Sequence, residues 1–167
     1  NDNLVKLEPN LRNKTKILKI DLGNEQDYEC LKSVLQQASS PIDGIVNIAG
    51  ISGEKESFLD KSIEEWKSIF QINLFSIVEL SKIVFPYMAK SHFGRGGSIV
   101  NLTSQVAQFG GNLLSAYAAS KGALNSLTIA LSKELGTEGI RVNAVSPSIV
   151  DLTNGKDSLL QKKIYQI

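Results

Sequence analysis

The chain has 167 residues, of which 42% are hydrophobic and 21% charged, a composition that fits a globular domain with a buried core. Its net charge of +1 gives no electrostatic reason to expect nucleic acid or a membrane surface as a partner. The single cysteine, Cys30, cannot form an internal disulfide, so we expect a cytoplasmic protein. We see no signal peptide and no apolar run of membrane-spanning length. Cys30 and His92 are interpreted as structural or surface residues, and no metal site is expected.

Short apolar runs alternate with helical patterns along the chain. The runs that predict buried strands are "KILKIDL" (16–22), "GIVNIAG" (44–50), "GGSIVNLTS" (96–104) and "IRVNAVSPS" (140–148). The helices are expected over 24–40, from 62 to about 90, and over 115–135.

Residues at the helix ends support these boundaries. Asn24 is a plausible N-cap, and Ser62 with Glu65 has the spacing of a capping box. Pro86 is expected to kink or fray the last turns of the second helix. Gly136 follows the third helix as a stop signal.

Strand–helix alternation predicts an α/β fold, in which a doubly wound parallel sheet carries helices on both faces. Ligands of such folds bind at the carboxyl ends of the strands. The residues at those ends are Asp21-Leu22, Asn47 to Gly50, Thr103-Ser104 and Ser146 to Ser148. We therefore expect Asp21, Ser104 and Ser148 to converge.

Two of the predicted helices carry polar residues that need an explanation. Asn73 lies on the apolar stripe of the helix that begins at Ser62, where an amide needs a hydrogen-bond partner. It either bonds the backbone and fixes a helix bend, or it holds a specific partner or a water. Tyr117 and Lys121 are i,i+4 neighbours on the next helix, a spacing that by itself is often only a surface feature.

Taken together, these motifs resemble those of the short-chain dehydrogenase/reductase family, over nearly the whole chain. Tyr117-x-x-x-Lys121 resembles the family's active-site motif, and Ser104 lies 13 residues upstream, where the family has its serine. Asn73 falls at the position of the fourth catalytic residue. Further resemblances lie in "VNIAG" (46–50), in Asp21-Leu22 and in the turn that begins at Pro147.

The resemblance implies an NAD- or NADP-dependent oxidoreductase that interconverts a carbonyl and a secondary alcohol, a small-molecule substrate. Tyr117 would be the acid/base, Ser104 would bind the substrate oxygen, Lys121 would bind the nicotinamide ribose and stabilise charge on Tyr117, and Asn73 would hold a water for proton relay. The cofactor-binding residues it implies are Asp21, Leu22, Asn47, Ala49, Gly50, Tyr117, Lys121, Pro147 and Val150. Within the family, the chain resembles the 3-oxoacyl-carrier-protein reductases and the sugar-alcohol dehydrogenases.

Several features depart from the family pattern. Ile48 replaces the second Asn of the strand-end motif, and Ser148 replaces a glycine, which would strain the backbone if that position needed a positive φ. Residues 1–20 contain no glycine, so the glycine-rich phosphate turn is missing. We expect a single partial Rossmann-type domain over 1–167 that lacks its first two strands and its last, with the choice between NAD and NADP left open.

The function of the chain therefore has two readings. The parent protein is expected to be an oxidoreductase, whereas the fragment alone is expected to be inactive. The alternative is an inactive relative that serves as a binding or assembly module, or a non-functional fragment. The helices 63–90 and 115–135 resemble those through which the family pairs its subunits, which implies a homodimer or homotetramer.

Overall fold

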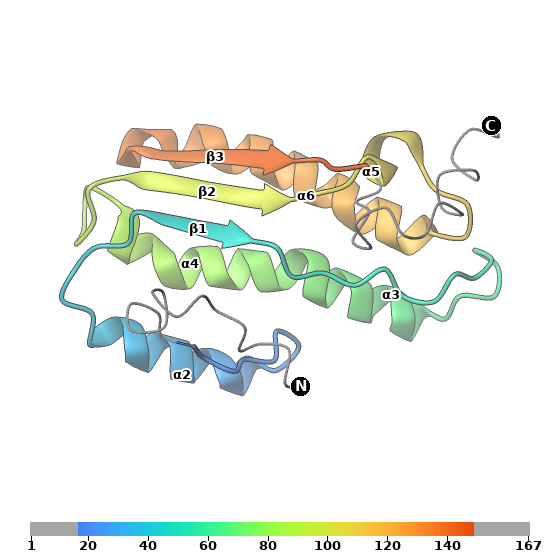
Figure 1. The fold of residues 1–167 in the computed structure, drawn as a ribbon, viewed down its shortest axis with the longest axis horizontal. Coiled ribbons are helices and arrows are strands. Elements are labelled where there is room, and N and C mark those ends of the chain that lie inside the picture. Colours follow the sequence, from blue (N-terminus) through green and yellow to red (C-terminus); the bar gives the residue numbers. More distant parts are fainter. Residues whose placement is uncertain (1–16, 149–167) are drawn as a thin grey trace, which may run out of the picture. The chain divides into compact units, whose positions relative to one another are not determined.

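A computed structural model describes residues 17–148 of the chain. The prediction for Val150 falls outside these residues. The chain divides into two compact units, Asn1–Ala38 and Ser39–Ile167, which are considered separately below. Figure 1 shows the element order along the ribbon.

The first unit is built around helix α2 (Glu25–Gln36). Its N-cap is Asn24, as predicted, because the Asn24 side chain accepts a hydrogen bond from the Gln26 amide at 3.1 Å. The hydroxyl of the buried Tyr28 donates to the Leu22 carbonyl at 2.9 Å and ties the lead-in segment to the helix.

The strand predicted over 16–22 is wrong for the described part of that range. Residues 17–21 have no regular secondary structure, and a turn begins at Leu22. A strand is held by hydrogen bonds to a neighbouring strand. Within residues 17–148 the sheet pairs three later segments of the chain, and none of them pairs with this one. The apolar pattern alone therefore does not produce a strand here.

The second unit contains a parallel sheet of three strands in the order β1-β2-β3. The strands are β1 (Gly44–Asn47), β2 (Gly97–Leu102) and β3 (Ile140–Val145). Asn47 aligns with Asn101, which aligns with Ala144. The predicted parallel α/β fold is thus confirmed. Each strand ends two or three residues before its predicted carboxyl end, where the chain leaves the sheet.

Two long helical segments cover one face of this sheet (Figure 1). The first is continuous from α3 (Ile63–Phe70) through the π-helical turn η2 (Gln71–Phe75) to α4 (Ser76–Met88), and the second is α6 (Ser115–Glu134). Right-handed crossovers that step in one direction across a parallel sheet place both helices on the same face. The shorter elements are α5 (Val106–Phe109) and η3 (Gly136–Glu138).

By length and composition, the segment Ile63–Met88 is long and apolar enough to cross a membrane, with a mean hydropathy of 1.4 over a stretch of 18 residues. In this respect the expectation from the sequence was wrong. A core helix of a soluble protein satisfies the same criteria, and this one buries Ile69, Ile77, Val84 and Met88. The helix ends two residues after Pro86, which agrees with the expected fraying.

A chain of buried polar side chains connects the sheet to α6. The Asn47 side chain donates to Asn101 Oδ1 at 2.8 Å, and Asn101 donates to Thr128 Oγ1 at 2.9 Å. Thr128 in turn donates to the Leu124 carbonyl at 2.8 Å. Because Asn101 is fully buried, its amide depends on these partners. These buried hydrogen bonds therefore hold β1, β2 and α6 in fixed positions relative to one another.

We predict that Asn101→Leu lowers the free energy of unfolding by about 2 kcal/mol, because Asn47 Nδ2 would be left buried without its acceptor. Urea denaturation of the whole protein measures this. The double variant Asn47→Leu/Asn101→Leu should recover part of the loss, since both partners are then apolar. If the two single losses simply add in the double variant, the two side chains are not coupled.

Candidate active site

Asn73 is the residue on which the candidate site is built. Its Oδ1 accepts from the Ile51 amide at 2.8 Å, and its Nδ2 donates to the Ile51 carbonyl at 2.8 Å. The same Nδ2 donates to Ser120 Oγ at 2.9 Å. The side chain is fully buried, so these bonds satisfy an amide that would otherwise be costly to bury. Asn73 therefore joins the loop after β1 to helix α6.

The helix adapts to this contact by widening. Asn73 lies within the π-helical turn η2, where the backbone accommodates one more residue per turn than an α-helix. Such turns aim a side chain in a direction that a regular helix would not offer. Of the two roles open for Asn73, the structure shows a specific partner, the Ser120 hydroxyl, together with bonds to the backbone of Ile51 outside the helix.

Ser120 connects Asn73 to helix α6, which carries Tyr117 and Lys121. Its hydroxyl accepts from Asn73 and donates to the Tyr117 carbonyl at 2.8 Å, within α6. Ser120 is fully buried. The turn of α6 that contains Tyr117 and Lys121 is thus held against the η2 turn by a hydrogen bond as well as by packing.

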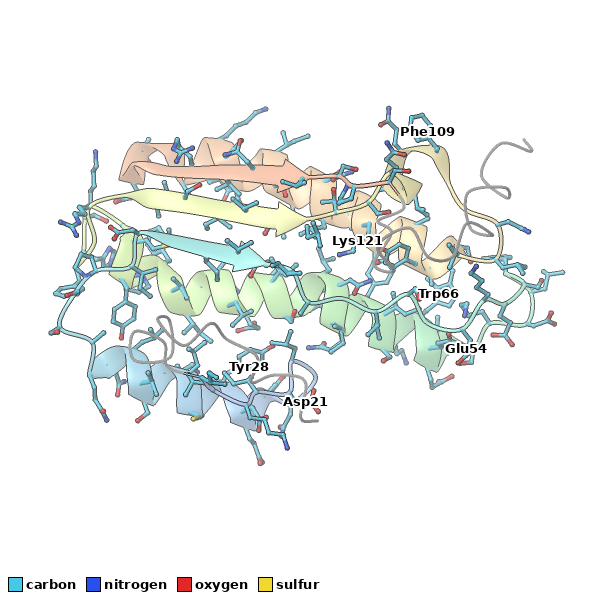
Figure 2. The ribbon with its side chains drawn as sticks, viewed as in Figure 1. Asp21, Tyr28, Glu54, Trp66, Phe109 and Lys121 are labelled. Atoms are coloured by element: carbon cyan, nitrogen blue, oxygen red, sulfur yellow. The ribbon has the colours of Figure 1, made fainter. Side chains whose placement is uncertain are left out.

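Lys121 is buried, with only 3% of its surface exposed, and its Nζ donates to the Leu102 carbonyl at 2.7 Å. Burial lowers the pKa of the Lys121 ammonium below its ordinary value. Its Nζ lies 6.0 Å from the centroid of the Tyr117 ring. Figure 2 shows Lys121 near the carboxyl ends of the strands. A buried cation at this edge can bind hydroxyl groups and favour nearby negative charge.

Gly50 packs closely against this ammonium. A methyl group added at Gly50 would lie 3.3 Å from Lys121 Nζ and 3.1 Å from Asn73 Oδ1. A larger residue at this position would therefore crowd both polar groups. The donor chemistry of the ammonium fits the hydroxyl groups at the ribose end of a nicotinamide cofactor.

Ser104 and Tyr117 are both partly exposed at the same end of the sheet. Ser104 follows β2 directly, and its Oγ accepts from the Val106 amide at 3.3 Å at the start of α5. Its hydroxyl hydrogen stays available to an incoming acceptor. The described geometry thus gathers Asn73, Ser104, Tyr117 and Lys121 at one edge of the sheet.

The other predicted cofactor residues are placed less uniformly. Ala49 and Gly50 are exposed just beyond β1, and the Pro147 carbonyl accepts from the Gln105 amide at 3.0 Å, next to Ser104. The Asn47 side chain turns into the core toward Asn101, so any cofactor contact from this residue has to come from its backbone.

Asp21 and Leu22 lie in the first unit. The Asp21 carboxylate accepts from the Gly23 amide at 2.9 Å in the turn before α2. Their expected convergence with Ser104 and Ser148 remains a prediction. Among residues 17–148 the one non-glycine residue with positive φ is Leu113. Ser148 therefore has an ordinary backbone conformation and is not strained.

Nothing in the sequence indicated one partner of the site, Ser120. Ser120 reads as an ordinary small residue within "YAASK", although it bonds Asn73.

The capping box at Ser62 is only half formed. Ser62 Oγ accepts from the Glu65 amide at 3.1 Å, but the Glu65 carboxylate bonds Lys61 Nζ at 2.6 Å instead of the Ser62 amide. The ammonium is the stronger donor, and its burial has no signature in the sequence.

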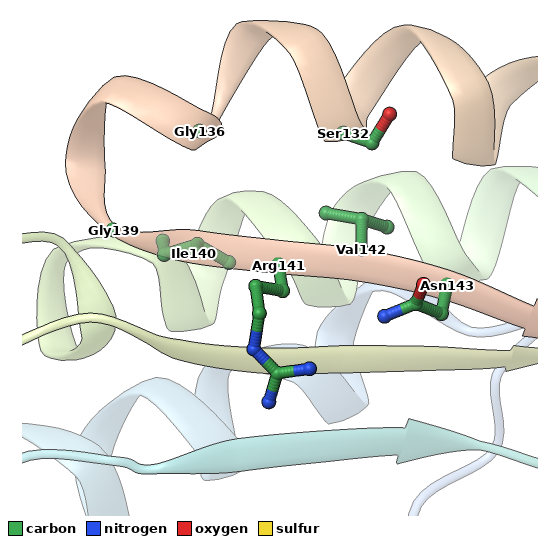
Figure 3. Close-up of a pocket in the computed structure, with 7 residues that line it drawn as sticks. All are labelled: Ser132, Gly136, Gly139, Ile140, Arg141, Val142 and Asn143. Carbon is green, nitrogen blue, oxygen red and sulfur yellow. The ribbon is translucent and has the colours of Figure 1, made fainter.

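A hollow of about 380 Å³ lies elsewhere, between the end of α6 and the amino-terminal half of β3 (Figure 3). Gly136, Ile140 and Arg141 are among the residues that line it. Lys121 and Ser104 are not part of it, so it is separate from the candidate site.

The model of the short chain dehydrogenase family matches residues 1–164 of the chain. The chain belongs to this family. The expected resemblance and the Rossmann-like fold are thereby confirmed, and the chain is a member of a family of oxidoreductases.

Among curated proteins, the chain is 37% identical to carbonyl reductase [NADPH] 2 of Sus scrofa over 139 residues, which cover 82% of this chain and 53% of that protein. It is 36% identical over 132 residues to the 3-oxoacyl-[acyl-carrier-protein] reductase of Thermotoga maritima, covering 77% and 52%. The human L-xylulose reductase is 36% identical over 139 residues, covering 82% and 53%. The chain thus spans about half the length of these relatives.

We predict that Asn73→Leu lowers the free energy of unfolding by about 3 kcal/mol, because the Ile51 backbone and Ser120 lose buried partners together. Thermal and urea denaturation measure this. Exposed Gln108→Leu, in α5, is the control and should change stability little. Equal effects of the two variants would show that the Asn73 bonds contribute nothing special.

Proposed function

We propose that the whole protein is an NAD(P)(H)-dependent oxidoreductase that interconverts a small carbonyl compound and a secondary alcohol. The observation that carries this proposal is the burial of the Lys121 ammonium beside Gly50, on the helix turn that also holds Tyr117. A buried cation next to a partly exposed phenol is suited to binding hydroxyls and moving a proton.

The bound nicotinamide would supply or accept the hydride, which no side chain can do. Lys121, with one N–H used by Leu102, would donate its remaining hydrogens to the ribose hydroxyls. The choice between NAD and NADP stays open.

The side chains would handle the proton and the oxygen. Tyr117 would donate its hydroxyl proton to the substrate oxygen during reduction and take it back during oxidation. Ser104 would donate a hydrogen bond to the same oxygen and stabilise its developing charge. The Lys121 ammonium would favour negative charge on Tyr117. Asn73 would position the backbone of Ile51, which it bonds, so that a water can be held there. Through this water, solvent would replace the proton that Tyr117 donates.

We predict that Tyr117→Phe lowers kcat by about 10²–10⁴-fold, because the phenol is the proton donor, while cofactor affinity stays nearly unchanged. Steady-state kinetics and cofactor titration of the whole protein measure the two quantities. Near-parental turnover of this variant would remove Tyr117 from the role of acid. A whole protein that binds cofactor without turning over carbonyl compounds would support the alternative, an inactive binding module.

Substitutions of Lys121 and of Ser104 are expected to have different effects on cofactor binding and turnover. Lys121→Met should weaken cofactor binding as well as turnover, because one ammonium serves both. Ser104→Ala should lower turnover and leave cofactor affinity intact, since Ser104 would contact the substrate and not the cofactor. An equal loss of cofactor affinity in both variants would contradict this division of roles.

We also propose that the protein is a homodimer or homotetramer built on α4 and α6. An apolar groove of about 340 Å³ lies between these helices and is lined by Val78, Phe85, Leu127 and Leu131, among others. Ser81 is another residue that lines the groove. A second copy could cover the apolar surface.

We predict that Leu131→Glu shifts the protein to monomer, because a carboxylate would be buried in the subunit contact. Analytical ultracentrifugation at micromolar concentration measures this. The exposed Lys133→Glu, on the same helix, is the matched control and should leave the oligomer intact. A parental protein that is already monomeric would overturn the assembly proposal.

A further inference from the structure

Lys61 is a buried ammonium that lies outside the proposed catalytic set. Its side chain is only 1% exposed, and its Nζ bonds Glu65 Oε1 at 2.6 Å and the Glu54 carbonyl at 2.8 Å. A weaker ion pair reaches Glu56 Oε2 at 3.7 Å. A buried charge is retained only with close partners, and here all of them lie on one loop and the first turns of α3.

The loop is residues 51–56, which we name the bridging loop. Its Glu54 amide donates to Glu65 Oε1 at 3.0 Å, the same oxygen that accepts from Lys61. Gly53 has a φ of +70°, and a methyl group there would lie 2.6 Å from Glu65 Oε1 and 2.7 Å from Ile69 Cδ1. The loop thus lies directly on the side chains of α3, and the positive φ of Gly53 favours glycine at this position. In Figure 2 Glu54 is beside the amino-terminal part of α3, near Trp66.

Each end of the bridging loop meets the candidate site. At the first end, Ile51 makes its two backbone bonds to Asn73. At the other end, the Glu56 amide donates to the Leu113 carbonyl at 3.3 Å. Leu113 lies four residues before Tyr117 and has a φ of 61°, in the left-handed region that is unfavourable for residues other than glycine. Surrounding contacts must therefore hold it.

Helix α6 begins just after this residue. Its N-cap residue, Leu114, makes no side-chain capping bond. The bond from the Glu56 amide to the Leu113 carbonyl holds the residue directly before that N-cap. The chain of contacts therefore runs from Lys61 through Glu54 and Glu56 to the residues that lead into Tyr117.

We propose that Lys61 is a positioning residue, which fixes the bridging loop as one wall of the candidate site and thereby holds the segment that leads into Tyr117. Its role in catalysis rests on the proposed function, whereas its role in ordering the segment does not. Lys61 touches neither Tyr117 nor Lys121 in the recorded hydrogen bonds and ion pairs of the described residues, so it acts through the loop.

Hydrogen–deuterium exchange of the whole protein tests the structural part. Lys61→Met should speed amide exchange in the peptides that cover residues 51–56 and 110–116 by about tenfold or more, because both segments lose their anchor. The matched control is Lys82→Met, which removes an exposed ammonium that pairs with Glu79 at 4.0 Å. Unchanged exchange over 110–116 in the Lys61 variant would overturn the proposal.

Kinetics test the catalytic part. We expect Lys61→Met to raise the KM for the carbonyl substrate about tenfold, to change kcat less, and to leave cofactor affinity unchanged, because the wall is displaced and the reacting groups are intact. Lys61→Arg should restore most of the loss by keeping the charge. A variant that loses cofactor affinity and kcat in equal measure, without rescue by arginine, would show a general loss of structure instead.

A second variant covers the case in which Lys61→Met does not fold. Glu65→Gln keeps the shape of the side chain and weakens its bonds to Lys61 and to the Glu54 amide, so it should give the same exchange pattern to a smaller extent. If the protein turns over no carbonyl compound at all, the proposed function fails and the exchange experiment still decides the role of Lys61. Wild-type exchange in both the Glu65 variant and the Lys61 variant would refute that role.

Discussion

The hydrogen bonds of one buried amide hold the candidate site together. Asn73 bonds both backbone groups of Ile51 and the hydroxyl of Ser120. These partners belong to the loop after β1 and to α6, two segments about 70 residues apart in the chain. Because the amide is inaccessible to water, each lost bond leaves a buried group unsatisfied. The contact therefore fixes the distance between the strand end and the helix that carries Tyr117 and Lys121.

The burial of Lys121 follows from the same arrangement. Packing α6 against η2 and the sheet removes the ammonium from water, which lowers its pKa and makes the charge costly to keep. Among residues 17–148 its hydrogen-bond partner is the Leu102 carbonyl. A structural lysine would gain little from this position. The cost becomes useful if a ligand brings hydroxyl oxygens to the ammonium, which is the use proposed here.

The sequence predicted the elements better than their contacts. Strands β1, β2 and β3 and both long helices were predicted because apolar periodicity depends on neighbours a few residues away. The segment before Leu22 failed, because forming a strand also requires a partner strand that local sequence cannot reveal. The position of Asn73 on an apolar stripe predicted that its side chain has a hydrogen-bond partner. It did not identify the partners, which are Ile51 and Ser120. Lys61 gave no signal at all: a lysine before a helix cap is usually solvated, and only the folded loop shows it buried.

The central claim is that Lys121, held at the carboxyl end of β2 by the Asn73 contact, meets the sugar of a bound nicotinamide cofactor. A crystal structure of the whole protein with NADH or NADPH bound is the direct measurement. The account predicts that Lys121 Nζ keeps its bond to the Leu102 carbonyl and lies within about 3.2 Å of a ribose oxygen, next to Gly50, with the Tyr117 hydroxyl facing the nicotinamide. A cofactor bound elsewhere, or a Lys121 side chain turned away from the ribose, would contradict it.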